Sequence, residues 1–221
     1  MMFPNWAKNI LFLLVYMISG LVLVIIIEGL TSGTELTPLN LVIERAMVRI
    51  RTPTMTTFLV TVTKLGNPFI LSSAAAFIAV LLVIRKRSYD AALFIVTMIL
   101  AVVSLTILKD TFQIARPGSE IVDVNGWSFP SGHATIATAF FFMLAHSFFG
   151  RMKTTGSKVV LILGSIIGAT LVCFSRLYLG AHWALDILAG VALGLLSVSF
   201  TVLMFNVFVG DWRSLRNKMS L

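Results

Sequence analysis

The sequence contains little of what several kinds of site require. Its 221 residues include one cysteine, three histidines and nine acidic residues. The single cysteine, Cys173, excludes an intramolecular disulfide, and the apolar residues around it indicate a small buried side chain. Because possible ligands are so few, we expect neither a metal nor another cofactor.

Charged residues are also scarce, at 12% of the chain, whereas 58% is hydrophobic and the mean hydropathy is +0.98. These values exclude a soluble globular domain and indicate one integral membrane domain, residues 1–221. A net charge of +8 would favour a nucleic-acid partner in a soluble protein. Here most cations lie in short clusters between apolar segments, as membrane orientation signals do, so no nucleic acid is expected.

Six segments of roughly 16 to 25 residues are apolar enough to cross the hydrocarbon core of a bilayer as helices. The first is preceded only by Lys8 and has no small-residue cleavage pattern after Ile27, so we interpret it as a retained anchor and not a signal peptide. The pattern predicts an all-α fold, a polytopic membrane bundle of six transmembrane helices at residues 10–27, 69–84, 91–108, 132–149, 159–175 and 184–208.

Lysine and arginine positions indicate the orientation, because cytoplasmic loops keep these cations and translocated loops tend to lose them. We therefore expect a multi-pass protein of the cell (inner) membrane with both termini in the cytoplasm. Three cations, Lys109, Arg116 and Arg176, lie at the outer ends of spans against this rule and require a reason. Ten of the 17 lysines and arginines fit a cytoplasmic N-terminus: Lys8, Arg85, Lys86, Arg87, Arg151, Lys153, Lys158, Arg213, Arg216 and Lys218.

The segment 30–66 between the first two spans carries apolar residues at near-helical spacing from Leu39 to Ile50, with charged residues between them. This pattern predicts an amphipathic helical segment on the outer surface. Two roles stay open for it: a structural cap over the bundle, or help in admitting a lipid from the bilayer.

The first motif is Lys109, six intervening residues and Arg116-Pro117, where the third span ends. Alone, the two cations could be interfacial side chains that extend their charged groups to water. As a phosphate clamp, the lysine would supply a point charge and the arginine two parallel donors.

The second motif, Pro130-Ser131-Gly132-His133, begins the fourth span. Proline and serine are ordinary helix-start signals. A helix start also presents free backbone N–H groups and the positive end of the helix dipole to an anion. Gly132 would let a phosphate approach closely, the Ser131 hydroxyl would add a donor, and His133 could donate a proton.

The third motif is Ser175-Arg176, five residues, His182, three residues and Asp186. On a helix, the i, i+4 spacing of His182 and Asp186 puts both side chains on one face, where the carboxylate can accept the proton of one imidazole nitrogen. The other nitrogen is then free to act as a nucleophile. A packed ion pair is the structural alternative.

The six-span topology places all three motifs on the outer face. Three cations, two histidines, a carboxylate and a helix N-terminus then form a site for an anion with several oxygens, and phosphate fits it best. The three motifs resemble the signature of the type-2 phosphatidic acid phosphatase family, whose superfamily includes glucose-6-phosphatase and vanadium haloperoxidases. The resemblance implies a metal-independent membrane lipid phosphatase with a phosphohistidine intermediate. Its small bacterial members favour phosphatidylglycerol phosphate or undecaprenyl diphosphate as the substrate.

The resulting hypothesis gives each residue a role. His182, oriented by Asp186, attacks phosphorus, and His133 donates a proton to the departing oxygen. The expected partners are a lipid phosphate and the bilayer, with no obligatory protein partner evident. The alternatives are a lipid phosphotransferase with the same intermediate and a non-catalytic anion-binding membrane protein. The expected phosphate-binding residues are Lys109, Arg116, Ser131, Gly132 and Arg176.

Overall fold

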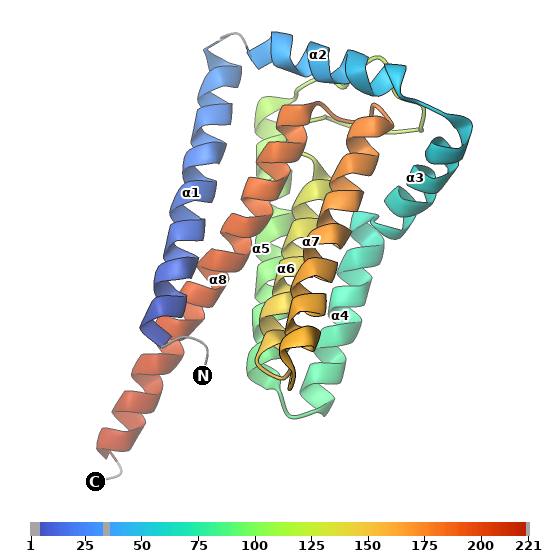
Figure 1. Cartoon of the computed structure of the whole chain (residues 1–221). Helices are drawn as coiled ribbons and strands as arrows, with labels where there is room; N and C mark the ends of the chain where they lie inside the picture. Colours follow the sequence, from blue (N-terminus) through green and yellow to red (C-terminus); the bar gives the residue numbers. More distant parts are fainter. Residues whose placement is uncertain (1–4, 33–35, 220–221) are drawn as a thin grey trace.

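The computed structural model describes residues 5–32 and 36–219, and side chains within 6–32 and 38–207. In this part of the chain every regular element is an α-helix, which confirms the all-α prediction. Figure 1 shows most of the helices standing roughly side by side as a bundle, with α2 lying across one end. The helices are α1 (Asn5–Thr31), α2 (Leu36–Arg49), α3 (Pro53–Leu65), α4 (Pro68–Ile84), α5 (Ser88–Phe112), α6 (Gly132–Phe149), α7 (Thr155–Tyr178) and α8 (Ala184–Met219).

Six membrane spans can be built from these helices, as predicted. Five are single helices long and apolar enough to cross a bilayer, namely α1, α5, α6, α7 and the part of α8 up to Val207. The sixth is a pair: α3 and α4 together pass the same test, with a bend of 45° between them. The predicted span 69–84 therefore corresponds to the 17-residue helix α4, which is only the second half of a broken span.

The segment 30–66 differs from the single amphipathic segment that the sequence predicts. An amphipathic helix does form there, as α2, but residues 53–65 form the separate helix α3. Thr52 caps α3, Pro53 occupies its first turn, and Gly66 ends it. The start of α4 follows at once, with the side chain of Asn67 accepting a hydrogen bond from the backbone N–H of Phe69 at 2.9 Å.

The helix α6 is the centre of the bundle and packs against α4, α5, α7 and α8. Its contact with α8 is close because two glycines of α8 lie directly on the α6 backbone. A Cβ at Gly190 would lie 2.7 Å from the carbonyl oxygen of Ser131, and one at Gly194 would lie 2.7 Å from that of Thr135. These glycines fix the starts of α6 and α8 side by side, and both starts carry predicted site residues.

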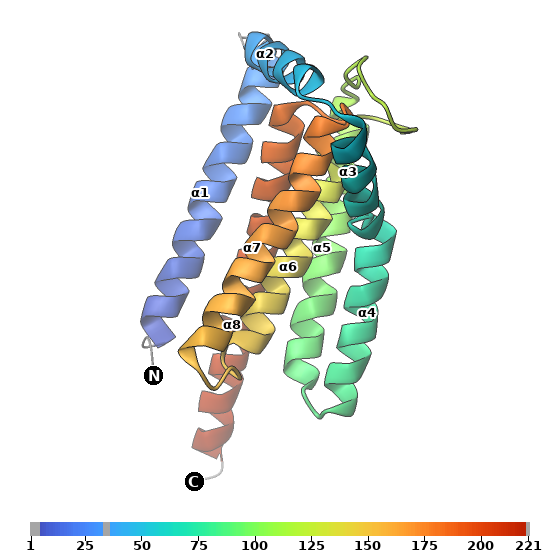
Figure 2. The same ribbon diagram turned by 45° about the vertical axis from the view of Figure 1, so that its right-hand side comes forward.

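Both ribbon views place the α4–α5 and α6–α7 connections at one end of the bundle and α2 with the α5–α6 loop at the other (Figures 1 and 2). The clusters Arg85–Arg87 and Arg151–Lys158 therefore lie away from the predicted site. His146 also lies toward that far end, in the last turn of α6, where its ring contacts Phe12 with 5.2 Å between centroids. Which end faces the cytoplasm stays a prediction.

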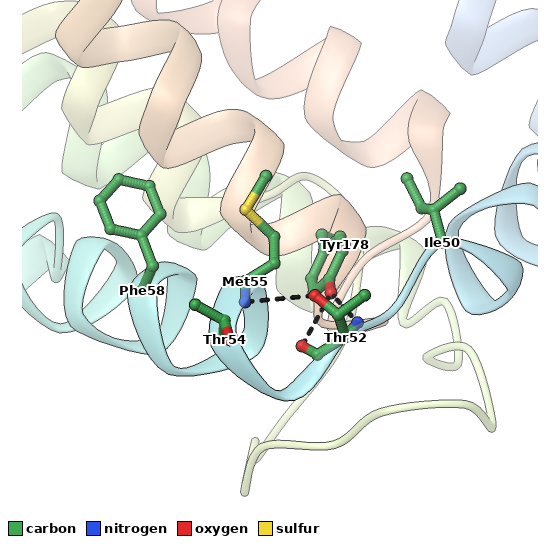
Figure 3. A pocket seen from close by; sticks show the side chains of 6 residues that line it. All are labelled: Ile50, Thr52, Thr54, Met55, Phe58 and Tyr178. Atoms are coloured by element: carbon green, nitrogen blue, oxygen red, sulfur yellow. Dashed lines mark hydrogen bonds between the residues drawn. The ribbon is translucent and has the colours of Figure 1, made fainter.

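The corner between α2 and α3 is attached to the end of α7. The hydroxyl of Tyr178 accepts a hydrogen bond from the backbone N–H of Thr52 at 2.7 Å, as Figure 3 shows. The Nε of Arg51 donates to the Tyr178 carbonyl oxygen at 3.0 Å, and its Nη1 donates to that of Ser119 at 2.8 Å. A cavity of about 660 Å³ lies here, lined by Ile50, Thr52, Thr54, Met55, Phe58 and Tyr178. Since its lining contains no cation, it is unsuited to phosphate.

Candidate active site

The predicted contact between His182 and Asp186 forms, but not on one face of a helix, because α8 begins only at Ala184. His182 lies in the turn before α8, and Asp186 lies in the first turn of that helix, with 3.5 Å between the imidazole Nδ1 and the carboxylate Oδ2. The same Oδ2 accepts the backbone N–H of Trp183 at 2.9 Å, as an acidic residue does when it caps its own helix from the first turn. Both side chains are almost fully buried, so this carboxylate is held by its helix while it orients the imidazole.

A third side chain completes this pair and was not identified from the sequence. The hydroxyl of Ser128 donates a hydrogen bond to Asp186 Oδ2, and its Oγ lies 3.3 Å from His182 Nδ1. Ser128 itself is fully buried. Its polar group therefore binds both the nitrogen and the oxygen that set the orientation of His182, which leaves Nε2 as the nitrogen available for attack.

Arg116 lies on the other side of His182, with its Nη1 3.3 Å from Nε2. Its donors are aligned by the loop before α6 and by Ala181, whose carbonyl oxygen accepts from Nη1 at 2.6 Å. The positive φ of Gly126 lets that loop turn its carbonyls toward the guanidinium. Three loop carbonyls accept its remaining bonds, at 2.9 Å for Gly126, 3.0 Å for Asn125 and 3.2 Å for Trp127.

The other two predicted cations converge on the same place from different helices. Lys109, in the last turn of α5, donates to the Trp127 carbonyl oxygen at 2.6 Å. Arg176, in the last turn of α7, is buried and donates from Nη1 to the hydroxyl of Thr63 at 2.9 Å. Its buried Nε has no hydrogen-bond partner in the described part of the chain. A buried, unpaired N–H of a guanidinium is costly, and a phosphate oxygen would satisfy it.

The second motif divides between the cavity and the protein interior. Gly132 and His133 begin α6 and face the same cavity as the cations. Ser131 is fully buried behind them as the cap of α6, where its Oγ accepts the N–H of Ala134 at 3.4 Å. Its own backbone N–H donates to the Asp186 carbonyl oxygen at 3.0 Å, which joins the starts of α6 and α8. Its placement suits helix capping better than direct phosphate contact.

One cavity of about 600 Å³ brings the predicted residues together. Asp186 and Ser131 are not part of its lining and support it from behind. The structure adds lining residues from the α3–α4 corner, among them Thr63, Lys64 and Asn67, which the sequence did not single out for the site. The predicted residues that line the cavity are Lys109, Arg116, Gly132, His133, Arg176 and His182.

The buried surroundings set the protonation of His182. Burial lowers its pKa from 6.5 to about 4, while the hydrogen bond and charge of Asp186 raise it in opposition. Burial also lowers the pKa of Arg116, against the charges of Asp186 and Glu120. At neutral pH His182 is therefore a neutral imidazole beside a cationic guanidinium, the arrangement that a nitrogen nucleophile and a phosphate need.

The lining suits an anion and not a metal ion. Its cations Lys64, Lys109, Arg116 and Arg176 face a single carboxylate, that of Asp123. Within residues 5–32 and 36–219, no three histidine, cysteine, aspartate or glutamate side chains gather as metal ligands would. The expectation of a metal-independent site stays a prediction, and the charge of the cavity is consistent with it.

Comparison with known proteins places this site in a family. The sequence model of the PAP2 superfamily matches residues 90–209, which include every predicted site residue. The chain belongs to the PAP2 superfamily. This membership confirms the resemblance that the three motifs indicate.

Individual PAP2 relatives agree in fold. Phosphatidylglycerophosphatase B of Bacillus subtilis is 29% identical over 157 residues, which are 70% of this chain and 77% of that protein. An undecaprenyl-diphosphatase of Sulfolobus acidocaldarius is 31% identical over 123 residues, covering 52% and 55% of the two chains. The crystal structure of a transmembrane PAP2 type phosphatidylglycerolphosphate phosphatase from Bacillus subtilis superposes with a TM-score of 0.75 at 23% identity, over 83% of this chain and 93% of that one.

The family, the spans and the cavity lead to one class of activity. The protein is a membrane lipid phosphatase of the PAP2 superfamily, as the motifs predict. The substrate and the role of each residue are separate questions, because the name of a relative describes the relative alone.

Proposed function

We propose that the protein removes the terminal phosphate of a lipid phosphate or diphosphate through a phosphohistidine at His182. The observation that carries the proposal is the environment of this histidine. Nδ1 faces Asp186 and Ser128, whereas Nε2 faces Arg116 and the cationic cavity. A histidine that only bound an anion would direct an N–H at it. Here the proton on Nδ1 is bonded to Asp186, so Nε2 presents a lone pair to the cavity, which suits attack on phosphorus.

In the first step, the Nε2 lone pair of His182 forms a bond to phosphorus and the bond from phosphorus to the lipid oxygen breaks. The proton on Nδ1 stays shared with Asp186, which stabilises the positive charge of the phosphorylated imidazole. His133 gives its proton to the departing oxygen, so the lipid leaves as an alcohol or, from a diphosphate, as a monophosphate.

In the second step, water attacks the phosphohistidine and His133 takes a proton from it, which releases inorganic phosphate and restores both histidines. Arg116, Arg176 and Lys109 stabilise the charge on the equatorial oxygens in both transition states, together with the N-terminus of α6 at Gly132. Ser131 contributes by holding that N-terminus in place.

The substrate class follows from the position of the cavity at one end of a membrane bundle. We infer a lipid whose phosphate enters the cavity while its chains stay in the bilayer, with phosphatidylglycerol phosphate and undecaprenyl diphosphate as the two candidates. The names of the two relatives above support both. The distribution of lysine and arginine supports a cavity on the outer face and cytoplasmic termini.

The decisive test measures phosphate release from both lipids with EDTA present, for the wild type, His182→Gln and His146→Gln. His146 is the matched control because it lies at the far end of α6 and does not line the cavity. We expect His182→Gln to lose at least about 10³-fold in kcat, as removal of a nucleophile does, and His146→Gln to retain turnover. Turnover in His182→Gln equal to that of the wild type would refute the proposed nucleophile.

A second measurement addresses the phosphotransferase alternative. Release of free phosphate without any acceptor lipid is expected of a phosphatase, and release that requires an added acceptor would show a transferase. Vanadate should inhibit competitively in the same assay, since it adopts the five-coordinate geometry of the transition state.

A further inference from the structure

The cavity has a second polar wall that the proposed chemistry does not use. Beyond the catalytic cluster, the corner between α3 and α4 contributes Lys64, Asn67 and Pro68 to the same lining. Lys64 is the only cation of this wall among the described lining residues. A cation in the substrate cavity but outside the catalytic motifs is a candidate for recognising a second charged group.

The break between α3 and α4 explains why polar groups face the cavity here. Lys64 lies in the last turn of α3, and its carbonyl oxygen accepts the backbone N–H of Asn67 at 3.2 Å. Asn67 uses its side-chain oxygen to cap α4, which leaves its amide Nδ2 as a donor without a partner among the described residues. The ammonium group of Lys64 likewise has no ion pair or hydrogen bond in this part of the chain. The corner thus presents two unengaged donors.

The corner is fixed against the catalytic part of α7. Thr63, the residue before Lys64, accepts the hydrogen bond of Arg176. Gly66 allows a close approach to α7, because a Cβ there would lie 2.4 Å from Cγ2 of Val172. Val172 is one helical turn before Arg176, so the corner and this phosphate-binding cation are held in a fixed relation.

The charge of the cavity exceeds that of one phosphate. With the histidines left out of the count, the four cations and the one carboxylate of the lining leave an excess of three positive charges. A phosphate monoester carries about −1.5 to −2 at neutral pH. A diphosphate, or a monoester joined through glycerol to a phosphodiester, adds roughly one further negative charge. The volume of about 600 Å³ lies in the range of small-molecule sites and leaves room for both groups.

We infer that Lys64 and Asn67 form a second anion subsite, which binds the non-scissile phosphate of lipids that carry two phosphate groups. The enzyme would then select such lipids over lipids with a single phosphate. The inference rests on the proposed function, because it places the scissile phosphate at His182. A polyprenyl diphosphate and a phosphatidylglycerol phosphate both carry a second phosphate group beside the scissile one, so the test includes both.

The test compares kcat/KM on undecaprenyl diphosphate, phosphatidylglycerol phosphate and phosphatidic acid, the last with one phosphate. The variants are Lys64→Gln, Lys64→Arg and Asn67→Ser, which keeps an oxygen to cap α4 but removes the amide donor. Arg49→Gln is the matched control, an exposed cation at the end of α2 that does not line the cavity.

For Lys64→Gln we expect the preference for the two-phosphate lipids over phosphatidic acid to fall about tenfold, as loss of one charge-assisted hydrogen bond implies. The lower kcat/KM on the two-phosphate lipids should arise from a higher KM, with kcat little changed. Lys64→Arg should keep most of the preference, Asn67→Ser should lower it less, and Arg49→Gln should preserve it. A larger fall on one two-phosphate lipid than on the other would identify which of them the subsite fits.

An unchanged preference in Lys64→Gln would overturn the inference, and so would a wild type that shows no preference at all. A uniform loss on all three lipids would assign Lys64 to general attraction of anions and would overturn it as well. Failure of the proposed function would look different from failure of this subsite. The wild type would then release no phosphate from any lipid, or His182→Gln would remain active.

Discussion

Three donors converge on one carboxylate oxygen in the site, and this convergence defines what Asp186 does. Oδ2 faces Nδ1 of His182, the hydroxyl of Ser128 and the backbone N–H of Trp183. Two of these donors are independent of the histidine and fix the carboxylate before any substrate binds. A fixed carboxylate can hold one imidazole tautomer, which is the requirement for attack through Nε2.

Ser128→Ala should therefore lower kcat by about 10- to 100-fold, as loss of a partner of an orienting group does. KM should change little, because Ser128 does not line the cavity. The measurement is steady-state phosphate release, with Ser197→Ala as the control for loss of a buried serine far along α8. The double variant with Asp186→Asn should lose less than the two single losses combined, since both act through His182. Full additivity would contradict the shared role.

The protonation of His182 gives a second prediction at this scale. Its imidazole should titrate near pH 4 and not near 6.5, because burial disfavours the charged form. Neutral His182 therefore favours the folded state above pH 6.5, and this contribution is lost as the pH falls toward 4. Asp186→Asn should lower the pKa further, since the carboxylate raises it.

The measurement is nuclear magnetic resonance of histidine-labelled protein, with the His182 signal assigned by its absence in His182→Gln. A His182 signal that titrates near 6.5 would contradict the prediction and would mean that water reaches the imidazole. The pKa of the imidazole in Asp186→Asn separates the effect of the carboxylate from that of burial.

A site residue can be identified from the sequence when its residue type is uncommon at its position. Lys109, Arg176 and Asp186 stand out because charged groups at the ends of apolar spans require partners. Ser128 does not, since a serine in a loop is ordinary and its partner is 58 residues away in the chain. Thr63 is hidden for the same reason: its contact with Arg176 joins residues 113 positions apart.

At the scale of helices, the site depends on how closely α6 and α8 approach. Gly190 lies on the carbonyl oxygen of Ser131, the residue that caps α6 just before Gly132 and His133. A methyl group at position 190 would separate the two helix starts. His133 would then move relative to His182, and misplacement of about 1 Å can cost roughly 10²-fold in rate.

Gly190→Ala should thus lower kcat at least about tenfold and cost about 1–3 kcal/mol of stability, as overpacking does. Gly164→Ala is the control, since a Cβ at Gly164 on α7 meets nothing within 4 Å. This control should retain activity and gain slightly in stability from the higher helix propensity of alanine. Thermal unfolding in detergent and kcat are the measurements, and equal behaviour of the two variants would exclude the close contact as the cause.

The broken span shows what sequence patterns convey about helices. Long apolar segments predict α1, α5, α6, α7 and the membrane-spanning part of α8, Ala184–Val207, within about five residues at each end, because length and hydropathy suffice for a span. The continuation of α8 to Met219 was not predicted. The helix α3 mixes threonine and lysine with apolar residues and was missed, although Thr52-Pro53 at its start and Gly66-Asn67-Pro68 at its end are readable helix signals. Its role at the cavity could not be predicted, because that depends on the 45° bend.

For the whole molecule, the chain separates its cations into two groups at opposite ends. One group lies at the cavity end: Lys64, Lys109, Arg116 and Arg176 line the cavity with one carboxylate, that of Asp123, whereas Arg45, Arg49 and Arg51 lie outside its lining. The other, at the turns 85–87 and 150–154, fits the rule that cytoplasmic loops retain lysine and arginine. Under the proposed function the cavity cations break this rule because they bind substrate, so the orientation should follow the other group and place the cavity outside the cytoplasm.

Cysteine labelling in intact cells tests this orientation, because the chain has a single cysteine and Cys173 is buried. Gly118→Cys places a thiol in the exposed loop before α6, where a Cβ meets nothing within 4 Å. Arg151→Cys places one in the exposed turn between α6 and α7 at the other end. A membrane-impermeant maleimide should label Gly118→Cys in intact cells and Arg151→Cys only after permeabilisation. The reverse pattern would put the cavity in the cytoplasm, and the phosphate would then be released there.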